Sequence, residues 1–449
     1  MNWTALLSGQ RSGVAHTLAD RTGFERDFDR VVFSSAFRRL QDKTQVIPLP
    51  ESDFVHTRLT HSLEVSCVAR SLGKMAGRVI IDRYNLKNFH ESDFGAICAT
   101  AALAHDIGNP PFGHSGEAAI SNYFSNGSGK EWNSLVQPHE WTDLTNFEGN
   151  AYGFKILTNY NEASGGNINL TFATLGAFTK YPTRSFRDAN INENDKKRVS
   201  RKKYGYFCSE QHLFNEVFDA LQIENTDTWS RLRHPLVYLV EAADDICYRI
   251  IDFEDGIRIG WIPFAEGEQL LIAVIGKDFS NERYHQITDR NEKIGYLRAK
   301  AINTLINTCS DLFLEHEQEM LTGKFDCSLI DLLPEAMQVP LNQLLELSIN
   351  HVYRSKSVLQ IEAAGFEIVG ELLDRFVRAG MDLKIHGKEL KKAKPYSDKL
   401  MRLMPPQFIK PADTTDYARI LGVCEFVAGM TDSYALSLYR KLKGIDLPT

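Results

Sequence analysis

The sequence predicts an all-α protein, and two observations favour this fold class. Apolar residues recur at helical spacing over most of the 449 residues, whereas the alternating pattern of β-strands is rare. Hydrophobic residues make up 43% of the chain and charged residues 24%, which is typical of a globular protein with a large buried core. We therefore expect a helical bundle with additional helices towards the C-terminus.

The predicted helices of the first half follow one another between clear stop signals. Residues 25–41 carry apolar side chains at helical spacing, and Thr60 is the expected N-cap of a second helix. A third helix is expected over residues 93–106, because the Asn-Pro-Pro segment at 109–111 forbids its continuation. The next helix should begin at Ser115.

The second half is also mostly helical by its apolar periodicity. One short hairpin is expected near Ile257–Ile262. We expect two parts, a core unit over residues 1–260 and a C-terminal helical region over 261–449 that completes the fold and forms an oligomer interface. The helical patterns cover residues 235–253, 289–317, 335–353, 355–379 and 416–442.

A polar segment over residues 158–207 interrupts the helical pattern. Asn, Gly, Ser and Thr dominate its first part, and residues 184–203 then hold eight basic and three acidic residues. We expect a surface excursion from the core, with a nucleic-acid or effector site as the alternative.

Composition excludes several classes of protein. The formal charge of −7 argues against a general nucleic-acid coat. No apolar run approaches the roughly 20 residues that span a bilayer, so we expect no membrane association. The seven cysteines are scattered and form no CxxC pair, which indicates a reducing cytoplasm.

The most informative segment, residues 104–117, holds two imidazole–carboxylate pairs around a Gly/Pro turn. His105 and Asp106 precede the turn, and His114 and Glu117 follow it. Imidazole nitrogen and carboxylate oxygen bind borderline and hard divalent ions, and a hydrolase leaves open positions beside such ligands. The segment therefore offers both a metal end and an acid/base end.

Two distant helices supply further candidate ligands. His61 lies early in a helix, and Asp244 lies within an apolar helix where a carboxylate is costly to bury unless a cation meets it. The neighbouring Asp245 is an alternative, since adjacent helical positions point about 100° apart. Tyr248 and Asp252 follow Asp244 at i+4 and i+8, so all three share one face of the helix.

Six motifs follow one another in a fixed order and cover residues 37–46, 58–62, 108–117, 146–151, 180–182 and 242–248. Together they resemble the deoxynucleoside triphosphate triphosphohydrolases, the dGTPase family of the HD phosphohydrolase superfamily. The resemblance is strong over residues 11–253 and looser beyond them, through residues 352–354 and 361–365.

This resemblance implies an all-helical HD-domain enzyme that converts a dNTP and water into deoxynucleoside and tripolyphosphate. It implies four metal ligands: His61, His105, Asp106 and Asp244. It implies a catalytic pair, His114 and Glu117, whose imidazole serves as acid, base or nucleophile. It also implies contacts to sugar and phosphates from Gln45, Arg58, Lys180, Tyr181, Tyr248 and Asp252.

The residue types suit this chemistry. Arg58 offers a planar, permanently charged fork for phosphate oxygens, and Lys180 offers a point charge. His114 can protonate the departing 5′-oxygen if Glu117 keeps the imidazole charged and aimed. A Tyr248 ring packed where a 2′-hydroxyl would lie would exclude ribonucleotides.

The resemblance also implies partners. We expect one divalent ion per active site, Mg²⁺ or Mn²⁺, with Co²⁺, Ni²⁺ or Fe²⁺ also compatible. We expect a homo-oligomer, plausibly a hexamer, and allow for a nucleotide effector or single-stranded DNA. Two alternatives stay open: another HD phosphohydrolase, such as a 5′-nucleotidase or phosphodiesterase, and a non-catalytic nucleotide-sensing or single-stranded-DNA-binding protein.

Overall fold

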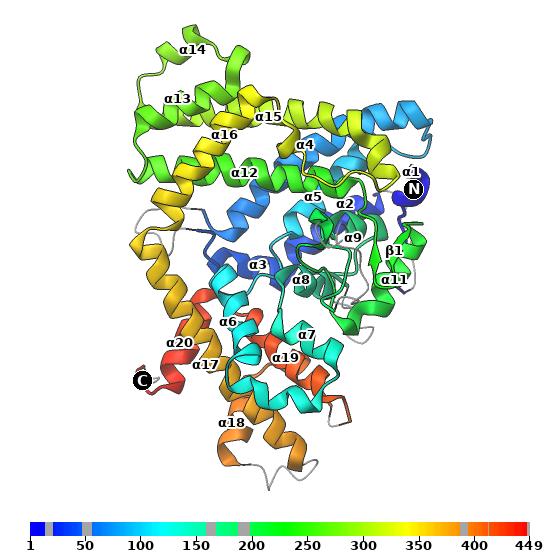
Figure 1. Ribbon diagram of the computed structural model, residues 1–449, viewed down its shortest axis with the longest axis vertical. Coiled ribbons are helices and arrows are strands. Elements are labelled where there is room, and N and C mark those ends of the chain that lie inside the picture. Colours follow the sequence, from blue (N-terminus) through cyan, green and yellow to red (C-terminus); the bar gives the residue numbers. More distant parts are fainter. Residues whose placement is uncertain are drawn as a thin grey trace.

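The computed structural model confirms the all-α class. In the described part of the chain a single small sheet occurs, in which β1 (Asn225–Asp227) pairs antiparallel with β2 (Ser230–Arg231). All other regular structure there is helical (Figure 1). The residues described are 1–13, 21–46, 56–158, 168–186, 198–386, 394–411 and 413–446.

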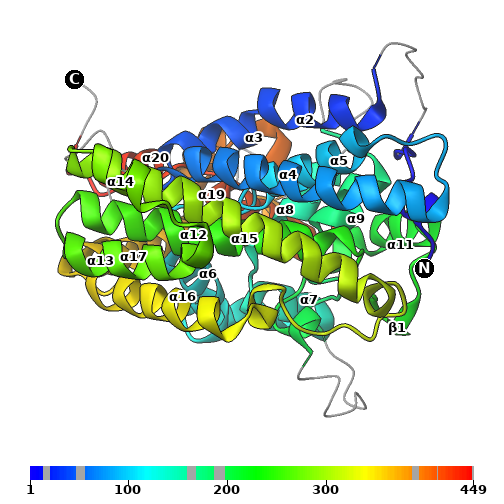
Figure 2. The same ribbon diagram turned by 90° about the horizontal axis from the view of Figure 1, so that it is seen from above.

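One group of long helices forms the larger hydrophobic core. Helices α4, α12 and α15 run side by side in Figure 2, with α5 against α4 and α2 against α5. Within the described residues, no helix combines the length and apolar character needed to cross a bilayer. The group comprises α2 (Gly23–Phe33), α4 (Arg58–Tyr84), α5 (Glu91–Ala104), α12 (Leu236–Arg258), α13 (Phe264–Ile275), α15 (Arg290–Leu321) and α16 (Glu335–Ser348).

A second group surrounds the long helix α17 in the lower half of Figure 1 and has its own apolar core. Helix α6 from the first half of the chain packs against α17, so this core combines distant segments. The boundary expected after residue 260 stays a prediction. The group comprises α6 (Gly113–Ser125), α7 (Pro138–Thr145), α17 (Lys356–His386), α18 (Pro395–Leu403), α19 (Asp416–Ala428) and α20 (Asp432–Leu442).

The remaining helices are short. The α-helical ones are α1 (Trp3–Leu6), α3 (Ser35–Arg38), α8 (Gly149–Thr158), α9 (Phe172–Phe178), α11 (Gln211–Ala220) and α14 (Asn281–Gln286). The 3₁₀ turns are η1 (Arg39–Asp42), η2 (Ser128–Leu135), η3 (Val199–Arg201), η4 (Cys208–Glu210), η5 (Gly276–Asp278), η6 (Ile330–Leu332) and η9 (Pro406–Phe408), and η7 (Ile349–Tyr353) is a π-helix.

Several predicted boundaries were wrong for local reasons. The helix expected over 25–41 breaks at Ser34, whose hydroxyl caps α3 by accepting the Phe37 N–H. Helix α4 begins earlier than expected, at Arg58, because Thr57 rather than Thr60 is its N-cap. Helix α6 begins at Gly113, two residues before the expected Ser115.

The hairpin expected at 257–262 was also wrong. Ile257 lies in the last turn of α12, and Ile262 packs into the core beyond a turn at Gly260, so the apolar residues that suggested a strand belong to a helix end and the turn after it. The helix expected over 416–442 is two helices, because Thr431 caps a new one.

The polar segment at 158–207 is described only over 158, 168–186 and 198–207. It contains the fully buried helix α9, which the sequence analysis did not expect. Arg184 stacks on Trp229, with its guanidinium carbon 3.4 Å from the ring centroid. Residues 187–197, which carry part of the basic run, lie outside the described residues.

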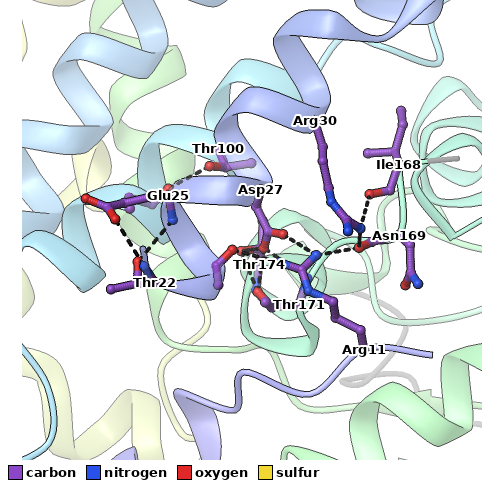
Figure 3. A network of polar contacts seen from close by, with 12 residues as sticks. Arg11, Thr22, Glu25, Asp27, Arg30, Thr100, Ile168, Asn169, Thr171 and Thr174 are labelled. Atoms are coloured by element: carbon purple, nitrogen blue, oxygen red, sulfur yellow. Dashed lines mark hydrogen bonds and ion pairs between the residues drawn. The ribbon is translucent and has the colours of Figure 1, made fainter. Parts of the chain in front are cut away.

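A buried network around Asp27 holds this segment and the N-terminus to α2 (Figure 3). The Asp27 carboxylate is fully buried and lies 2.6 Å from Arg11 Nη1. It also accepts hydrogen bonds from the Thr171 backbone and hydroxyl and from the Thr174 hydroxyl. A buried carboxylate is stable only when its oxygens are satisfied in this way.

Candidate active site

A cavity of about 640 Å³ opens where the two groups of helices meet. Its walls come from the start of α4, the turn after α5, the start of α6, the middle of α12 and the start of α17. Among the predicted site residues that line it are Gln45, Arg58, His61, His105, Asp106, His114, Lys180, Tyr181, Asp244 and Tyr248. Glu117 and Asp252 do not reach the wall.

Three of the four predicted metal ligands converge at one end of the cavity. One ligand atom each of His61, His105 and Asp244 lies within 4.8 Å of the others. Asp244 Oδ1 is 3.2 Å from His61 Nε2 and 3.6 Å from His105 Nε2. The carbonyl of Ala102 lies 2.7 Å from His105 Nδ1, so that nitrogen donates and the Nε2 lone pair faces the group.

The protonation of Asp244 follows from these neighbours. Burial opposes its ionisation, but the nearby imidazoles of His105 and His61 outweigh burial and hold the pKa of Asp244 at about 2. The neighbouring Asp245 has fewer cationic partners, and burial raises its pKa to about 7. Asp244 is therefore the ionised carboxylate of the pair at neutral pH.

Asp106 lies beside this group, but its carboxylate is shared with other partners. Its Oδ1 is 3.5 Å from His105 Nε2, while its Oδ2 accepts a 2.6 Å hydrogen bond from Arg58 Nη1. Burial opposes ionisation of Asp106, but Arg58 outweighs it and the pKa lies below its usual range. The Asn109 side chain also donates to Asp106.

These donors fit a divalent cation. Two imidazole nitrogens and one ionised carboxylate oxygen point at one another, with a second ionised carboxylate beside them. Within the described residues, His61 Nδ1 is buried without a hydrogen-bond partner, so its ring is oriented by the hydrogen bond to Asp244 and by edge-on packing against His105. Mixed nitrogen and oxygen ligands suit Mn²⁺, Fe²⁺, Co²⁺ and related ions, with water or substrate filling the open positions.

His114 and Glu117 form a hydrogen-bonded pair on the first turn of α6. His114 Nδ1 lies 2.8 Å from Glu117 Oε2, and Glu117 Oε1 accepts the Gly149 backbone N–H at 2.8 Å. This bond to Glu117 raises the pKa of His114. The imidazole is exposed to the cavity while the carboxylate is buried behind it, so the pair presents to a ligand an imidazole whose charged form is favoured.

The backbone that presents His114 is strained. Phe112 has φ 61°, a left-handed conformation that disfavours a bulky side chain by about 1–2 kcal/mol. Gly113 follows with φ 56°, and a Cβ there would lie 2.5 Å from Arg58 Nη2. Only glycine satisfies both the backbone and the guanidinium at this position.

Lys180 enters the cavity from the turn after α9. Its Nζ lies 3.3 Å from Glu241 Oε1 on α12, and Glu241 Oε2 is held by Arg233 at 3.0 Å. Burial lowers the pKa of Lys180, but Glu241 outweighs burial and keeps the amine charged. Arg233 also donates to the Lys180 carbonyl, which fixes the backbone there.

Aromatic rings form another part of the cavity wall. Tyr248 stacks on Tyr353 of η7, with ring centroids 5.6 Å apart and planes 3° apart. Asp252 accepts a 2.8 Å hydrogen bond from the Tyr353 hydroxyl and is buried behind it. Burial raises the pKa of Asp252 to about 6. Within the described residues, the Gln45 side-chain oxygen on this cavity is buried and accepts no hydrogen bond.

The sequence analysis missed several lining residues, among them Lys203, Tyr353 and Glu241. Lys203 lies 3.8 Å from Glu117 and 3.1 Å from Glu148, although its basic run was interpreted as a surface excursion. Tyr353 and Glu241 also line the cavity. Glu241 carried a signal, a carboxylate in an apolar helix, whereas Lys203 carried none because its run reads as solvated.

Comparisons with known proteins identify similar proteins. The HD domain profile matches residues 58–142, and the phosphohydrolase-associated domain profile matches residues 332–441. A deoxyguanosinetriphosphate triphosphohydrolase-like protein of Synechocystis sp. is 42% identical, and one of Pseudomonas aeruginosa is 38% identical, each with all of both chains covered. The deoxyguanosinetriphosphate triphosphohydrolase of Cronobacter sakazakii is 29% identical, with 94% of each chain covered.

Proposed function

Because the chain belongs to the family of deoxyguanosinetriphosphate triphosphohydrolase-like proteins with an HD domain, we propose that it hydrolyses deoxynucleoside triphosphates to deoxynucleoside and tripolyphosphate. We infer that dGTP is among its substrates, which the names of its relatives support. The reaction joins a water oxygen to the α-phosphorus and breaks the bond between that phosphorus and the 5′-oxygen.

One observation carries this proposal. The cavity combines a metal-type donor group, a charged imidazole and three cationic side chains, those of Arg58, Lys180 and Lys203. A triphosphate carries several negative charges, which repel an attacking oxygen unless cations offset them. Arg58 offers a planar fork for phosphate oxygens, and the two lysines offer point charges.

His114 is the proposed proton donor. The 5′-oxygen of the sugar is a poor leaving group, and a proton from the imidazole would make it depart as a hydroxyl. Glu117 supports this role because its hydrogen bond favours the charged form of His114. General acid catalysis of this kind contributes about 10²–10⁴-fold to a rate.

His61, His105 and Asp244, with Asp106 beside them, would hold one divalent ion. When bound, such an ion polarises a phosphoryl oxygen and lowers the pKa of its water towards about 7. Mg²⁺ and Mn²⁺ are the proposed ions, and Co²⁺, Ni²⁺ and Fe²⁺ also suit the ligands. We propose no separate metal role for Asp245, which has the higher pKa.

The flat pair of Tyr248 and Tyr353 is the proposed wall for the deoxyribose. A ring packed against C2′ leaves no room for a 2′-hydroxyl, which would explain selection against ribonucleotides. Tyr248→Ala should raise GTP turnover relative to dGTP turnover. Unchanged discrimination between these two nucleotides would remove this part of the proposal.

The deciding experiment incubates the protein with each of the four dNTPs and with GTP, in Mg²⁺ and in Mn²⁺. Nucleoside and tripolyphosphate are measured separately. Release of inorganic phosphate or pyrophosphate instead of tripolyphosphate would indicate another HD phosphohydrolase. Binding of single-stranded DNA without turnover would indicate the non-catalytic alternative. His114→Ala should abolish release, while His212→Ala, an exposed histidine on α11, should not.

The partners implied by the resemblance stay predictions. They are self-association into a homo-oligomer, plausibly a hexamer, and dependence on a nucleotide effector or single-stranded DNA. Light scattering on the purified chain measures the first. Turnover of one dNTP with and without a second nucleotide measures the other.

A further inference from the structure

The first residue of α20 connects the C-terminal helices to two segments that line the cavity. Asp432 Oδ1 accepts the Phe112 backbone N–H at 2.9 Å, and Asp432 Oδ2 accepts the Thr44 backbone N–H at 2.9 Å. Asp432 is buried, and both of its partners line the cavity. One carboxylate therefore joins two segments that are far apart in the sequence.

The hydrogen bond between Phe112 and Asp432 acts on a strained part of the backbone. Phe112 holds a left-handed conformation directly before α6, and His114 follows two residues later. A conformation of this kind persists only when the surroundings determine it. The ring of Phe112 packs directly against Gly365 of α17, so closely that a Cβ on Gly365 would lie 2.4 Å from Phe112 Cγ.

The Thr44 contact acts in the same way on the second of these segments. Thr44 immediately precedes Gln45, whose side chain lines the cavity. Because both backbone N–H groups bind one carboxylate, Asp432 holds these two segments together, alongside Lys43, whose ammonium group donates to the Asn109 and Ala428 carbonyls. A further contact holds the start of α6 to α17, because the Ser115 hydroxyl donates to the Glu362 carbonyl at 2.6 Å.

We propose that Asp432 is a positioning residue, which holds the Phe112 turn and the Thr44 segment so that His114 and Gln45 face the substrate. The inference rests on the proposed function for the role of His114. It assigns to the C-terminal helices a direct part in ordering the reacting groups. Misplacement of such groups by about 1 Å lowers rates by about 100-fold.

The test is Asp432→Asn, which keeps the shape of the side chain but leaves only one acceptor oxygen for two N–H groups. Asp416→Asn is the matched control, because Asp416 is the first residue of α19 after a threonine N-cap and pairs with Lys384 away from the cavity. For Asp432→Asn we expect kcat to fall about 10- to 100-fold while KM changes less than about threefold. Asp416→Asn should leave both within about twofold.

Hydrogen exchange supplies a readout that needs no turnover. The backbone amides of Phe112 and Thr44 should exchange at least about tenfold faster in Asp432→Asn, while Asp416→Asn should leave them unchanged. Equal kcat in the two variants, or unchanged exchange at both amides, would overturn the inference. If Asp432→Asn does not fold, Asp432→Glu, which displaces both oxygens, is judged by the same criteria.

The two proposals fail in different ways. If the unmodified protein releases no tripolyphosphate from any dNTP, the proposed function is wrong, and the exchange experiment still decides the role of Asp432. If turnover occurs and the two aspartate variants behave alike, only the positioning role is wrong.

Discussion

Replacing Glu117 with glutamine tests the acid role of His114, because the structure determines how the new amide must point. Glu117 Oε1 accepts the Gly149 backbone N–H, a contact that only an oxygen can keep. The glutamine NH₂ must therefore face His114 Nδ1. A protonated imidazole presents an N–H there as well, so two donors would oppose each other and the charged form of His114 would lose its stabilisation.

The size and sign of the effect follow from that contact. The hydrogen bond to Glu117 is the main reason why the pKa of His114 lies above its ordinary value near 6.5, with burial opposing it. A hydrogen bond to a charged group is worth about 1.5–3 kcal/mol, so the charged form of His114 should be about 10- to 100-fold less favoured in Glu117→Gln. A raised pKa keeps the acid form present at higher pH, so its loss should move the alkaline limit of activity to lower pH.

The assay is the pH profile of kcat/KM for tripolyphosphate release. Above the shifted limit Glu117→Gln should be about 10- to 100-fold slower than the unmodified protein, with a smaller difference below about pH 6. Glu319→Gln is the control, because Glu319 pairs with His316 at the same i,i+3 spacing on α15 outside the cavity. An alkaline limit that stays in place in Glu117→Gln would refute the acid role.

Three further predictions concern the metal group, the turn and the core. His105→Ala should weaken Mn²⁺ binding, measured by calorimetry. The loss should exceed the about 10–100-fold that follows removal of a residue that only hydrogen-bonds to a metal ligand. Binding within a few fold of the unmodified protein would contradict the metal site. Gly113→Ala should lower kcat/KM by about 10-fold or more because its Cβ meets a guanidinium nitrogen, while Gly370→Ala, with open space around it, should be neutral. Asp27→Ala should lower the free energy of unfolding in urea by about 3–5 kcal/mol, whereas Asp29→Ala, in an exposed pair, should cost at most about 1 kcal/mol; equal losses would contradict the importance of burial.

Helix α12 illustrates what local periodicity can and cannot predict. Its spacing placed Asp244, Tyr248 and Asp252 on one face, and the first two do line the cavity. Each i+4 step rotates by about 40° around the helix, so Asp252 lies about 80° from Asp244. Tyr353, about one hundred residues later, covers Asp252, and no local pattern reports that contact.

The residues around the metal group show the same division. The sequence identified the imidazoles and carboxylates, because their chemical types are visible in any order. Whether Asp106 faces the metal group or Arg58 depends on how the start of α4 meets the end of α5, which is a matter of packing. Lys203 could not be identified, since the sequence pattern of a charged run is the same whether its lysine lies in solvent or in a cavity.

The sequence by itself determined the helical class, most helix positions and the inventory of reactive side chains, because these depend on neighbours a few residues apart. The tertiary structure decided which of those side chains meet, since convergence depends on contacts between distant segments. Asp432 is the clearest case: a carboxylate beginning the last described helix meets the Phe112 turn because α6 and α20 both pack against α17.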